Sequence, residues 1–394
     1  MRCTIEAADE LEALLMIEEK FQDVFVVADN VYSPIGKTTA ENFINLKNNI
    51  GGVRRHAPNE MSAQPFYAAL FCDEEHIFRN DSFTKFEQLL IASIDNALKL
   101  ADIDVRNDKT VVIISTTKGN ISLLETEKYS ESLKKRIALT TSAKLVADHF
   151  GFKPKPVVVS NACISGVLGI ITAMRLLRSG TYENAVIAGA DMISKFILSG
   201  FQSFQALSPG VCRPFDKSHD GLNLGEGAGT IILSTNKKYA GNLIVKGGSL
   251  SNDANHISGP SRTGEELAQA ISKSIADAGV RTDEIGFISA HGTGTVYNDE
   301  MEANAVRIAG ADKLPLNSLK GYYGHTLGAA GLIETIISVE SLRQGLFIGT
   351  PGFDVAPESH PVNASADHRN IKANNFLKTA SGFGGCNAAV VIGK

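Results

Sequence analysis

The first 240 residues alternate between short apolar runs and longer segments of helical spacing. The runs are bounded by turn-forming residues, and their length and valine–isoleucine content predict buried strands. These predicted strands are Phe25–Ala28, Thr110–Ser115, Pro156–Ser160, Asn184–Asp191 and Gly229–Ser234. Residues 30–36 are predicted to form a turn, and residues 122–150 a helical stretch.

The same pattern restarts after residue 240. Strands are predicted over residues 242–250, 285–290 and 387–394, and a helix over Gly264–Ala278. Residues 314–345 predict a strand, a glycine-rich loop and a long helix. Strands that alternate with helices favour an α/β fold, in which helices cover both faces of mixed, mostly parallel sheets.

The length of the chain favours two packed halves. Its 394 residues exceed the roughly 250–300 at which a single core stops growing. Two similar halves are therefore expected, over residues 23–240 and 241–394, with no low-complexity linker between them. Residues 1–22 form an N-terminal extension with the pattern of an amphipathic helix, because Leu11, Leu14, Leu15 and Phe21 lie near one face.

Composition and charge narrow the classes of function. The net charge is −5 and the pI is near 6.0, so no basic excess points to nucleic acid. No apolar run reaches about 18 residues and no signal-peptide core follows Met1, so we expect no membrane span and a cytoplasmic location. The five cysteines are odd in number, far apart and without a CxxC pair, which disfavours a disulfide framework or a zinc site.

Cys163 follows the predicted strand at 156–160 and precedes an apolar segment of helical spacing. Its small neighbours Ala162, Ser165 and Gly166 allow a tight turn, which places the thiol near a helix N-terminus. There the helix dipole and free N–H groups are expected to lower the thiol pKa and to supply an oxyanion-hole donor. The segment predicts a nucleophile, although a buried structural cysteine fits the same residues.

Two histidines lie in glycine-rich loops that follow predicted strands. His291 lies in "SAHGTGT", where Thr293 and Thr295 offer hydroxyl groups, and His325 lies in "KGYYGHTLGAAG". Taken singly, each histidine fits a structural role better than a catalytic one. Together with Cys163 they indicate a catalytic constellation, and the absence of HxxxH or HExxH spacing disfavours a metal site.

The remaining glycine-rich segments are weaker signals. "SGFGGCN" surrounds Phe383 with glycines that permit a positive φ and a backbone N–H aimed at a substrate, although a simple turn before the last strand fits equally well. "GEGAG" at 225–229 lacks GxGxxG spacing, which disfavours a dinucleotide site. Neither a P-loop nor a GxSxG elbow occurs.

Five motifs in order now resemble a known family. They are "NACISG", "RPFDKSHDGLNLGEGAG", "HGTGT", "KGYYGHTLGAAG" and "GFGGCN". The set is similar to the β-ketoacyl-acyl carrier protein synthases of types I and II, in the thiolase-like superfamily, from about Phe25 to Lys394. The resemblance implies a five-layer αβαβα fold, usually a homodimer, with a heterodimer also possible. It also implies an acyltransferase that condenses a Cys-bound acyl group with malonyl-acyl carrier protein, in fatty acid or polyketide/polyene biosynthesis.

The resemblance also implies roles for individual residues. These are Cys163, His291 and His325 as the triad, Lys320 and Glu334 as a supporting pair that orients His325, Thr293 and Thr295 as ligands of the phosphopantetheine arm, and Phe383 as the gate, whose N–H joins that of Cys163 in the oxyanion hole. No metal or redox cofactor is implied, because phosphopantetheine arrives on the carrier-protein substrate.

The chain departs from the family pattern at several positions. Asn161 replaces a common threonine, His219 replaces arginine, Gly321-Tyr322-Tyr323 replaces Ser-Met-Thr, and Cys386 replaces threonine. These departures favour a specialised polyketide or polyene pathway over a housekeeping role. Two alternatives remain: a non-decarboxylating thiolase with Cys386 as its second cysteine, and a non-catalytic chain-length partner subunit.

Overall fold

The computed structural model describes residues 22–72, 82–255 and 257–394. The strands of the N-terminal half are β1 (Phe25–Tyr32), β4 (Thr110–Ser115), β5 (Val157–Val159), β6 (Asn184–Asp191) and β8 (Gly227–Ser234). Those of the C-terminal half are β9 (Ile244–Asn252), β10 (Ile285–Ser289), β11 (Leu316–Asn317), β14 (Asn375–Gly382) and β15 (Cys386–Gly393). Of the extension expected over residues 1–22, residues 1–21 lie outside the described residues.

The ten strands hydrogen-bond in the order β11-β10-β14-β15-β9-β1-β8-β6-β4-β5. The two halves therefore contribute five neighbouring strands each, and they meet where β1 pairs with β9 through Phe25 and Ile244. The expected mixture of strand directions is confirmed, but the expectation of mostly parallel sheets is wrong. Among the described residues of this ten-stranded sheet, parallel pairing is confined to β10–β11, β10–β14, β4–β5 and β4–β6. β8 and β15 run antiparallel to both neighbours, so each half contains a return strand that the alternating pattern did not reveal.

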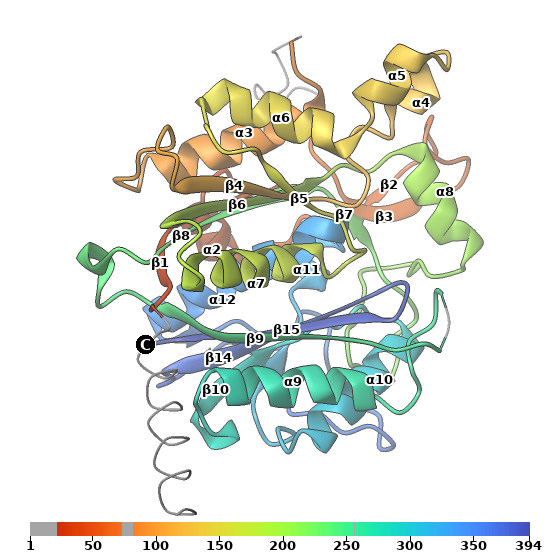
Figure 1. Ribbon diagram of the computed structural model, residues 1–394. Helices are drawn as coiled ribbons and strands as arrows, with labels where there is room; N and C mark the ends of the chain where they lie inside the picture. Colours follow the sequence, from red (N-terminus) through yellow and green to blue (C-terminus); the bar gives the residue numbers. More distant parts are fainter. Residues whose placement is uncertain (1–21, 73–81, 256) are drawn as a thin grey trace, which may run out of the picture.

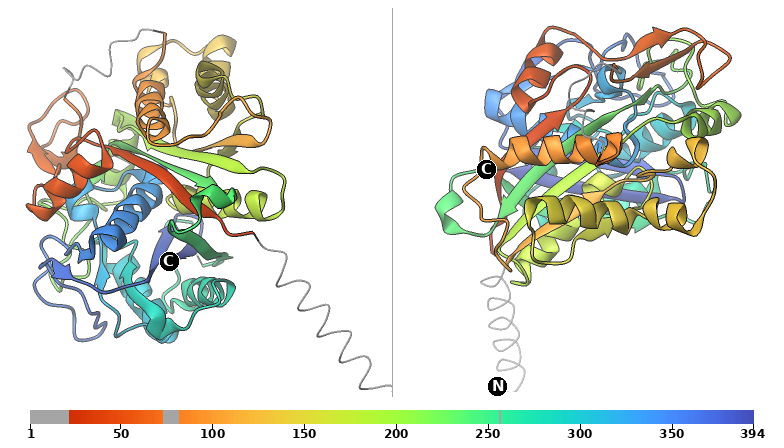
Figure 2. Two further views of the ribbon diagram at one scale, coloured as in Figure 1. Left: turned by 90° about the vertical axis from the view of Figure 1, so that its left-hand side faces the viewer. Right: turned by 90° about the horizontal axis from the view of Figure 1, so that it is seen from above.

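Helices separate and cover the two sets of strands, which gives the five layers that the resemblance implied (Figure 1). The central layer contains α2 (Thr39–Lys47), α7 (Ser165–Arg178), α11 (Lys320–Tyr323) and α12 (Ala330–Gln344). One outer layer contains α3 (Lys85–Leu98) and α6 (Leu139–Phe150), which cross the N-terminal strands when seen from above (Figure 2). The other contains α9 (Glu265–Asp277) and α10 (Val296–Ile308).

Most strands and helices lie within a few residues of their predicted places. Strand β1 extends through Tyr32 into the expected turn, which shortens to a bridge between Ser33 and Gly36. The helical stretch expected at 122–150 divides into α4 (Leu123–Thr126), α5 (Glu131–Arg136) and α6. The Ser130 hydroxyl accepts the N–H of Leu133 and so starts α5 as a separate helix.

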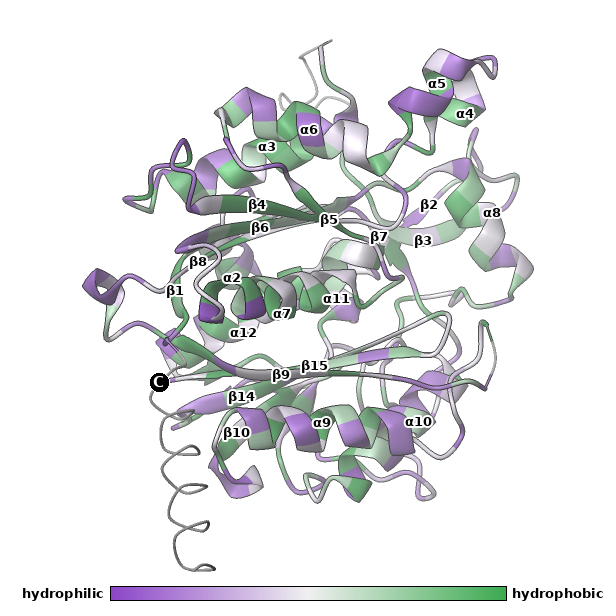
Figure 3. Ribbon diagram, viewed as in Figure 1, coloured by the Kyte–Doolittle hydropathy of each residue, from purple (hydrophilic) through white to green (hydrophobic). Residues whose placement is uncertain are grey.

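The central layer is apolar and closely packed. Helix α12 is buried over nearly its whole length, and α7 buries the face that follows Cys163. A Cβ atom on Gly166 would lie 2.5 Å from the Leu332 amide nitrogen, so only glycine permits this approach of α7 to α12. Figure 3 shows hydrophobic strands in both sheet layers and mixed hydropathy on the outer helices. The close backbone contact between α7 and α12 therefore packs the two halves against each other.

Smaller elements surround this frame. A three-stranded sheet of β2 (Arg54–His56), β3 (Phe66–Ala69) and β7 (Leu224–Gly225) lies beside α8 (Lys195–Ser203) (Figure 1). The short strands β12 (Leu346–Phe347) and β13 (Arg369–Asn370) form an antiparallel pair. Within the residues that the structure describes, no helix combines the length and hydrophobicity that a membrane span requires.

Candidate active site

Cys163 lies in the short turn between β5 and α7. Ala162 has φ of 44°, a left-handed conformation that costs energy for any residue other than glycine. The Ser165 hydroxyl accepts the Asn161 N–H at 2.8 Å and donates to the Ala162 carbonyl at 2.7 Å, which holds the turn closed. The strained turn directs the thiol into a pocket instead of into the core.

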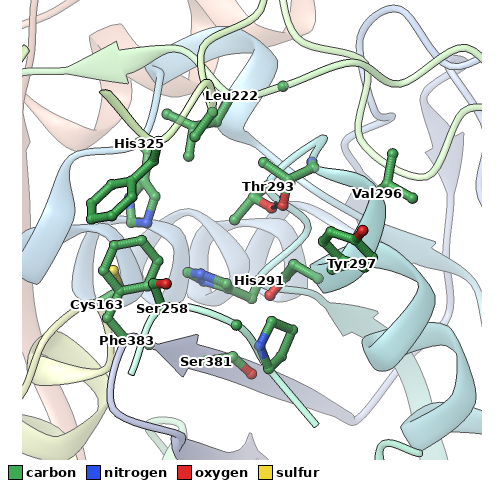
Figure 4. Close-up of a pocket in the computed structure, with 18 of the residues that line it drawn as sticks. Cys163, Leu222, Ser258, His291, Thr293, Val296, Tyr297, His325, Ser381 and Phe383 are labelled. Carbon is green, nitrogen blue, oxygen red and sulfur yellow. Dashed lines mark hydrogen bonds between the residues drawn. The ribbon is translucent and has the colours of Figure 1, made fainter. Parts of the chain in front are cut away.

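The structure brings the three predicted reactive side chains together. Cys163 Sγ and one ring nitrogen each of His291 and His325 all lie within 4.8 Å of one another. The two imidazole rings meet edge to face with centroids 5.2 Å apart. Figure 4 shows His291 between the Cys163–His325–Phe383 side of the pocket and the side formed by Thr293, Val296 and Tyr297.

The pocket has a volume of about 430 Å³ and is lined by six of the eight predicted site residues. They are Cys163, His291, His325, Thr293, Thr295 and Phe383. Phe383 is 40% exposed, stacks on Phe201 at 6.0 Å and meets Phe204 edge to face at 5.7 Å. The two threonine hydroxyls lie 2.7 Å apart and hydrogen-bond each other. An aromatic cluster therefore stands beside the thiol, and a hydroxyl pair lines the same pocket.

Lys320 and Glu334 lie behind the histidines and are buried. Lys320 Nζ lies 2.7 Å from Glu334 Oε1, 3.3 Å from His291 Nδ1 and within hydrogen-bond distance of the His291 carbonyl. The hydrogen bonds of Lys320 therefore lead to His291, whereas the sequence expectation placed the pair at His325. The influence of Lys320 on His325 is electrostatic. Gly324 has a φ of 67°, and the Nδ1 of His325 accepts the Leu327 N–H.

Sequence reasoning missed two further charged residues of this site. Lys378 on β14 is buried and lies 2.7 Å from Glu334 Oε2. Glu302 on α10 accepts the N–H groups of His291 at 2.8 Å and Gly292 at 2.7 Å. The available signal for Lys378 was a charged residue inside the apolar strand "NFLKTAS", which demands a buried partner.

The hydrogen bonds at Nδ1 define the protonation of both histidines. The Leu327 N–H donates to His325 Nδ1 at 3.2 Å, and Lys320 Nζ faces His291 Nδ1 at 3.3 Å. Burial first, and then the nearby lysine charges, hold the pKa of both imidazoles well below the usual range. A neutral ring that accepts at Nδ1 carries its proton on Nε2. We infer that each histidine presents an Nε2–H donor.

The pKa of the Cys163 thiol differs from the sequence expectation. Burial raises it to about 12, although Lys320 and a hydrogen bond from the Phe383 backbone N–H favour the thiolate. The helix N-terminus therefore does not produce a resting thiolate, because removal of the sulfur from water outweighs it. The Phe383 backbone N–H nevertheless hydrogen-bonds the Cys163 sulfur, which places this donor beside the reacting atom.

The same three side chains have the spacing of a metal site. Their donor set does not fit a cation, because an Nε2 that carries a proton has no free lone pair. The ammonium groups of Lys320 and Lys378 behind the rings add electrostatic repulsion against a metal ion. A thiol between two neutral N–H donors suits covalent acyl transfer through a thioester, since those donors can stabilise a developing oxyanion.

Comparison with known proteins places this acyl-transfer site in a family. The beta-ketoacyl synthase N-terminal domain matches residues 22–238, and the beta-ketoacyl synthase C-terminal domain matches residues 243–354. The first match alone spans more than half of the chain, and the chain therefore belongs to the beta-ketoacyl synthase family. The protein is an acyltransferase of the condensing type, and the resemblance seen in its motifs is confirmed.

Individual relatives agree over nearly the whole length. The 3-oxoacyl-[acyl-carrier-protein] synthase 2 of Vibrio cholerae is 29% identical over 409 residues, covering 94% of this chain and 98% of that protein. The ishigamide ketosynthase/chain length factor superposes with a TM-score of 0.85 at 26% identity, covering 95% of this chain and 99% of that one. The ketosynthase AntDE, solved with its acyl carrier protein AntF, has a TM-score of 0.83 at 22% identity over 95% and 99%, which shows the shared fold alone.

Proposed function

We propose that this enzyme condenses an acyl group on Cys163 with malonyl-acyl carrier protein, with loss of CO2. The observation that carries the proposal is the convergence of the Cys163 thiol and one ring nitrogen of each histidine within 4.8 Å, with a donor facing the Nδ1 of each ring. A decarboxylating condensation needs a nucleophile for the acyl chain and donors for an enolate oxygen, and this arrangement supplies both.

In the first half-reaction the Cys163 sulfur attacks the thioester carbonyl of the acyl-carrier protein. A new C–S bond forms, and the phosphopantetheine thiol leaves with the proton that the thiol gives up. The carbonyl oxygen, negatively charged in the tetrahedral intermediate, accepts hydrogen bonds from the backbone N–H groups of Cys163 and Phe383. The thiol pKa near 12 means that deprotonation accompanies attack and does not precede it.

In the second half-reaction the malonyl thioester oxygen accepts from Nε2–H of His291 and His325. Breaking the bond to the carboxylate releases CO2 and leaves an enolate, whose negative oxygen those two donors stabilise. The enolate carbon then attacks the acyl carbonyl on Cys163, which departs as thiolate and recovers a proton from solvent. Neutral imidazoles suit this step, because each can donate while its Nδ1 stays fixed.

Support for the arm-binding role comes from the loop that holds Thr293 and Thr295. Asp299 accepts the Thr293 N–H at 2.9 Å and the Gly294 N–H at 3.2 Å, and these hydrogen bonds fix the conformation of the loop. Both threonine hydroxyls border the pocket and can hydrogen-bond the amides of a phosphopantetheine arm. Lys320 and Glu334 act as positioning residues in this proposal, and Phe383 acts as the gate.

Partners follow from the same proposal. The acyl carrier protein is the expected donor of both thioesters, in line with the complex of the AntDE ketosynthase with its acyl carrier protein AntF. The outermost strand β5 has a free edge among the described residues, and half-buried Val157 and Val158 favour pairing with a second subunit. A homodimer and a heterodimer with a chain-length partner both fit, and native mass spectrometry separates them. A cytoplasmic location stays a prediction from the sequence.

The two alternatives agree less well with the site. A thiolase requires a second thiol facing the substrate, but Cys386 is buried and its Sγ lies 3.4 Å from the Phe383 carbonyl and 3.8 Å from that of Asn161. Burial raises the pKa of this thiol to about 11, which disfavours it as an acid–base catalyst. A non-catalytic partner subunit would have no use for the strained turn that presents Cys163.

The test is intact-protein mass spectrometry with a panel of acyl-carrier-protein thioesters, beside the Cys163→Ala variant. A mass gain of one acyl group that requires Cys163 is the expected result. Cys163→Ala should still release CO2 from malonyl-carrier protein, because decarboxylation does not need the thiol. Normal condensation by Cys163→Ala, or no acylation of a folded wild-type protein by any donor, would overturn the proposal.

A further inference from the structure

Lys378 is a charged residue at the centre of the fold that the catalytic scheme above does not use. It lies on β14 between Leu377 and Thr379, and its ammonium group is fully buried. Its Nζ donates to the carbonyls of Ser289 at 3.1 Å and Ala290 at 2.9 Å and pairs with Glu334 Oε2 at 2.7 Å. The lysine therefore holds the two residues that immediately precede His291.

Lys320 makes the same kind of contacts with the next residue, His291. It donates to the carbonyl of His291, faces His291 Nδ1 and pairs with the other oxygen of Glu334 at 2.7 Å. Each ammonium group thus has three partners, which equals its three donors. Glu334 bridges the two lysines, and together they hold three consecutive carbonyls that end at His291.

The charges of this cluster balance only when Lys378 is counted. Lys320 and Lys378 are two cations, and Glu334 and Glu302 are two buried anions. Glu302 belongs to the same cluster, because it accepts the N–H groups of His291 and Gly292 and the Thr379 hydroxyl at 2.6 Å. Removal of Lys378 would leave one cation against two anions beside His291. An uncompensated buried charge is costly, and the field it produces acts on neighbouring titrations.

We propose that Lys378 is a positioning residue for the condensation, which keeps His291 neutral and aligned as an Nε2–H donor. The proposal rests on the proposed function of this site and deepens it. Lys378 shares Glu334 with Lys320, so that Lys320 keeps a donor for His291 Nδ1 instead of turning fully to the carboxylate. Its positive charge also disfavours protonation of the imidazole. A buried ion pair is seldom the most stable core, and an apolar residue at 378 would pack there without these two effects.

Loss of Lys378 should act on His291 in a definite direction. Without the charge of Lys378 the pKa of His291 rises. On acidification, the imidazole then becomes protonated at a higher pH than in the wild-type enzyme. Protonation at Nδ1 sets an N–H against the Lys320 ammonium and breaks the alignment of Nε2. The titratable and charged groups that face His291 from the surrounding elements are Cys163, Glu302, Lys320, His325, Glu334 and Lys378.

The test compares Lys378→Met, which keeps the length and removes the charge, with Lys378→Gln, which can still donate to a carbonyl. Decarboxylation of malonyl-carrier protein and acylation of Cys163 are measured separately on the full chain, each across pH 5–8. We expect decarboxylation to fall about tenfold to hundredfold, as for a misplaced catalytic group, with acylation reduced much less. The acid limb of decarboxylation should move to higher pH in both variants.

A charge-balanced control sharpens the result. Lys378→Met combined with Glu334→Gln leaves one cation and one anion, so its acid limb should return towards that of the wild-type enzyme. An equal loss in both half-reactions with an unchanged pH profile would show a merely structural role and overturn the proposal. Unchanged decarboxylation in a folded Lys378→Met protein would overturn it as well. Failure of the proposed function is distinct, because the wild-type enzyme itself would then neither take an acyl group nor release CO2.

Discussion

The two histidines occupy matching places in the pocket but are held by different means. Charged side chains hold His291: Glu302 accepts its N–H, and Lys320 contacts both its carbonyl and Nδ1. The backbone holds His325: its N–H donates to the Asn223 carbonyl at 2.6 Å, its carbonyl accepts the Gly225 N–H at 3.1 Å, and the Leu327 N–H meets Nδ1. The two rings present the same donor although their supports share little.

This difference separates what a substitution can change at each histidine. Side-chain support can be removed one charge at a time, and it adjusts the pKa of the ring as well as its position. Backbone support disappears only when the chain itself moves, so it should be lost together with folding stability. Substitutions on the two sides should therefore leave distinct signatures in activity, pH dependence and melting temperature.

The largest expected effect is the loss of either donor. His291→Ala and His325→Ala should each lower decarboxylation of malonyl-carrier protein by roughly 100- to 1000-fold, the usual cost of one oxyanion donor. Acylation of Cys163 should fall less, because its oxyanion rests on backbone N–H groups. Release of CO2 from each variant gives the comparison. A loss of only a few-fold in one variant would show that the histidines are not equivalent donors.

Removal of the charged support of His291 should have the next largest effect. Lys320→Met should lower decarboxylation about tenfold to hundredfold while the protein stays folded, because Glu334 keeps its pair with Lys378. The lost cation raises the pKa of His291, so activity should disappear at a higher pH as the pH falls. A pH profile of CO2 release measures the shift, and a profile identical to that of the wild-type enzyme would contradict the assignment.

The backbone support of His325 predicts the opposite signature. Gly225→Ala places a Cβ atom 1.9 Å from the Tyr323 carbonyl oxygen and so displaces the segment before His325. We expect a stability loss of about 1–3 kcal/mol, as for other overpacked sites. Activity should fall in step with the folded fraction, with no change in the shape of the pH profile. Thermal melts and assays on one preparation decide between this outcome and an unchanged melting temperature.

The smallest effect concerns the loop that carries the threonines after His291. Burial raises the pKa of Asp299 to about 6, and its carboxylate accepts the amides of Thr293 and Gly294. As the pH falls through about 6, the protonated carboxyl loses an acceptor, and KM for malonyl-carrier protein should rise about fivefold, the worth of one hydrogen bond of about 1 kcal/mol. His219→Arg places a permanent charge beside Asp299 and should move this rise to lower pH. A KM that stays constant down to pH 5 would exclude this role.

The sequence predicted the site better at its motifs than at its supports. Cys163, His291 and His325 follow strands and lie in glycine-rich turns. Such local signals can be recognised in the sequence without knowledge of the tertiary structure. Lys378 inside an apolar strand signals a buried partner but does not identify it, because its partners are far away in sequence and come near only when β14 lies beside β10. Glu302 lies only about one helical segment after His291 and Gly292, but no motif marks it as the acceptor of their N–H groups. The contact of Lys320 with His291 likewise joins residues 29 positions apart, which spacing alone does not disclose.

The fold, too, could be predicted from the sequence only where the signal was local. Strand positions followed from apolar runs, and Thr110–Ser115 and Asn184–Asp191 form over their predicted residues. Strand direction did not follow, because a buried antiparallel strand such as β8 is as apolar as a parallel one. The pKa of Cys163 also needed the structure, since the helix N-terminus was visible in the sequence but the depth of burial was not.

The order of the parts along the chain has a consequence for protein synthesis. Cys163 lies in the first half, whereas Lys378 and Phe383 lie on β14 and in the turn after it, behind every other described element except β15. At about 5–20 residues per second, the thiol is carried on the nascent chain for on the order of ten seconds or more before those residues leave the ribosome. Until β14 docks beside β10, the cysteine has neither the Phe383 amide nor an aligned His291. An unfinished chain thus lacks this donor and the aligned histidine, and the proposed condensation requires the final strands.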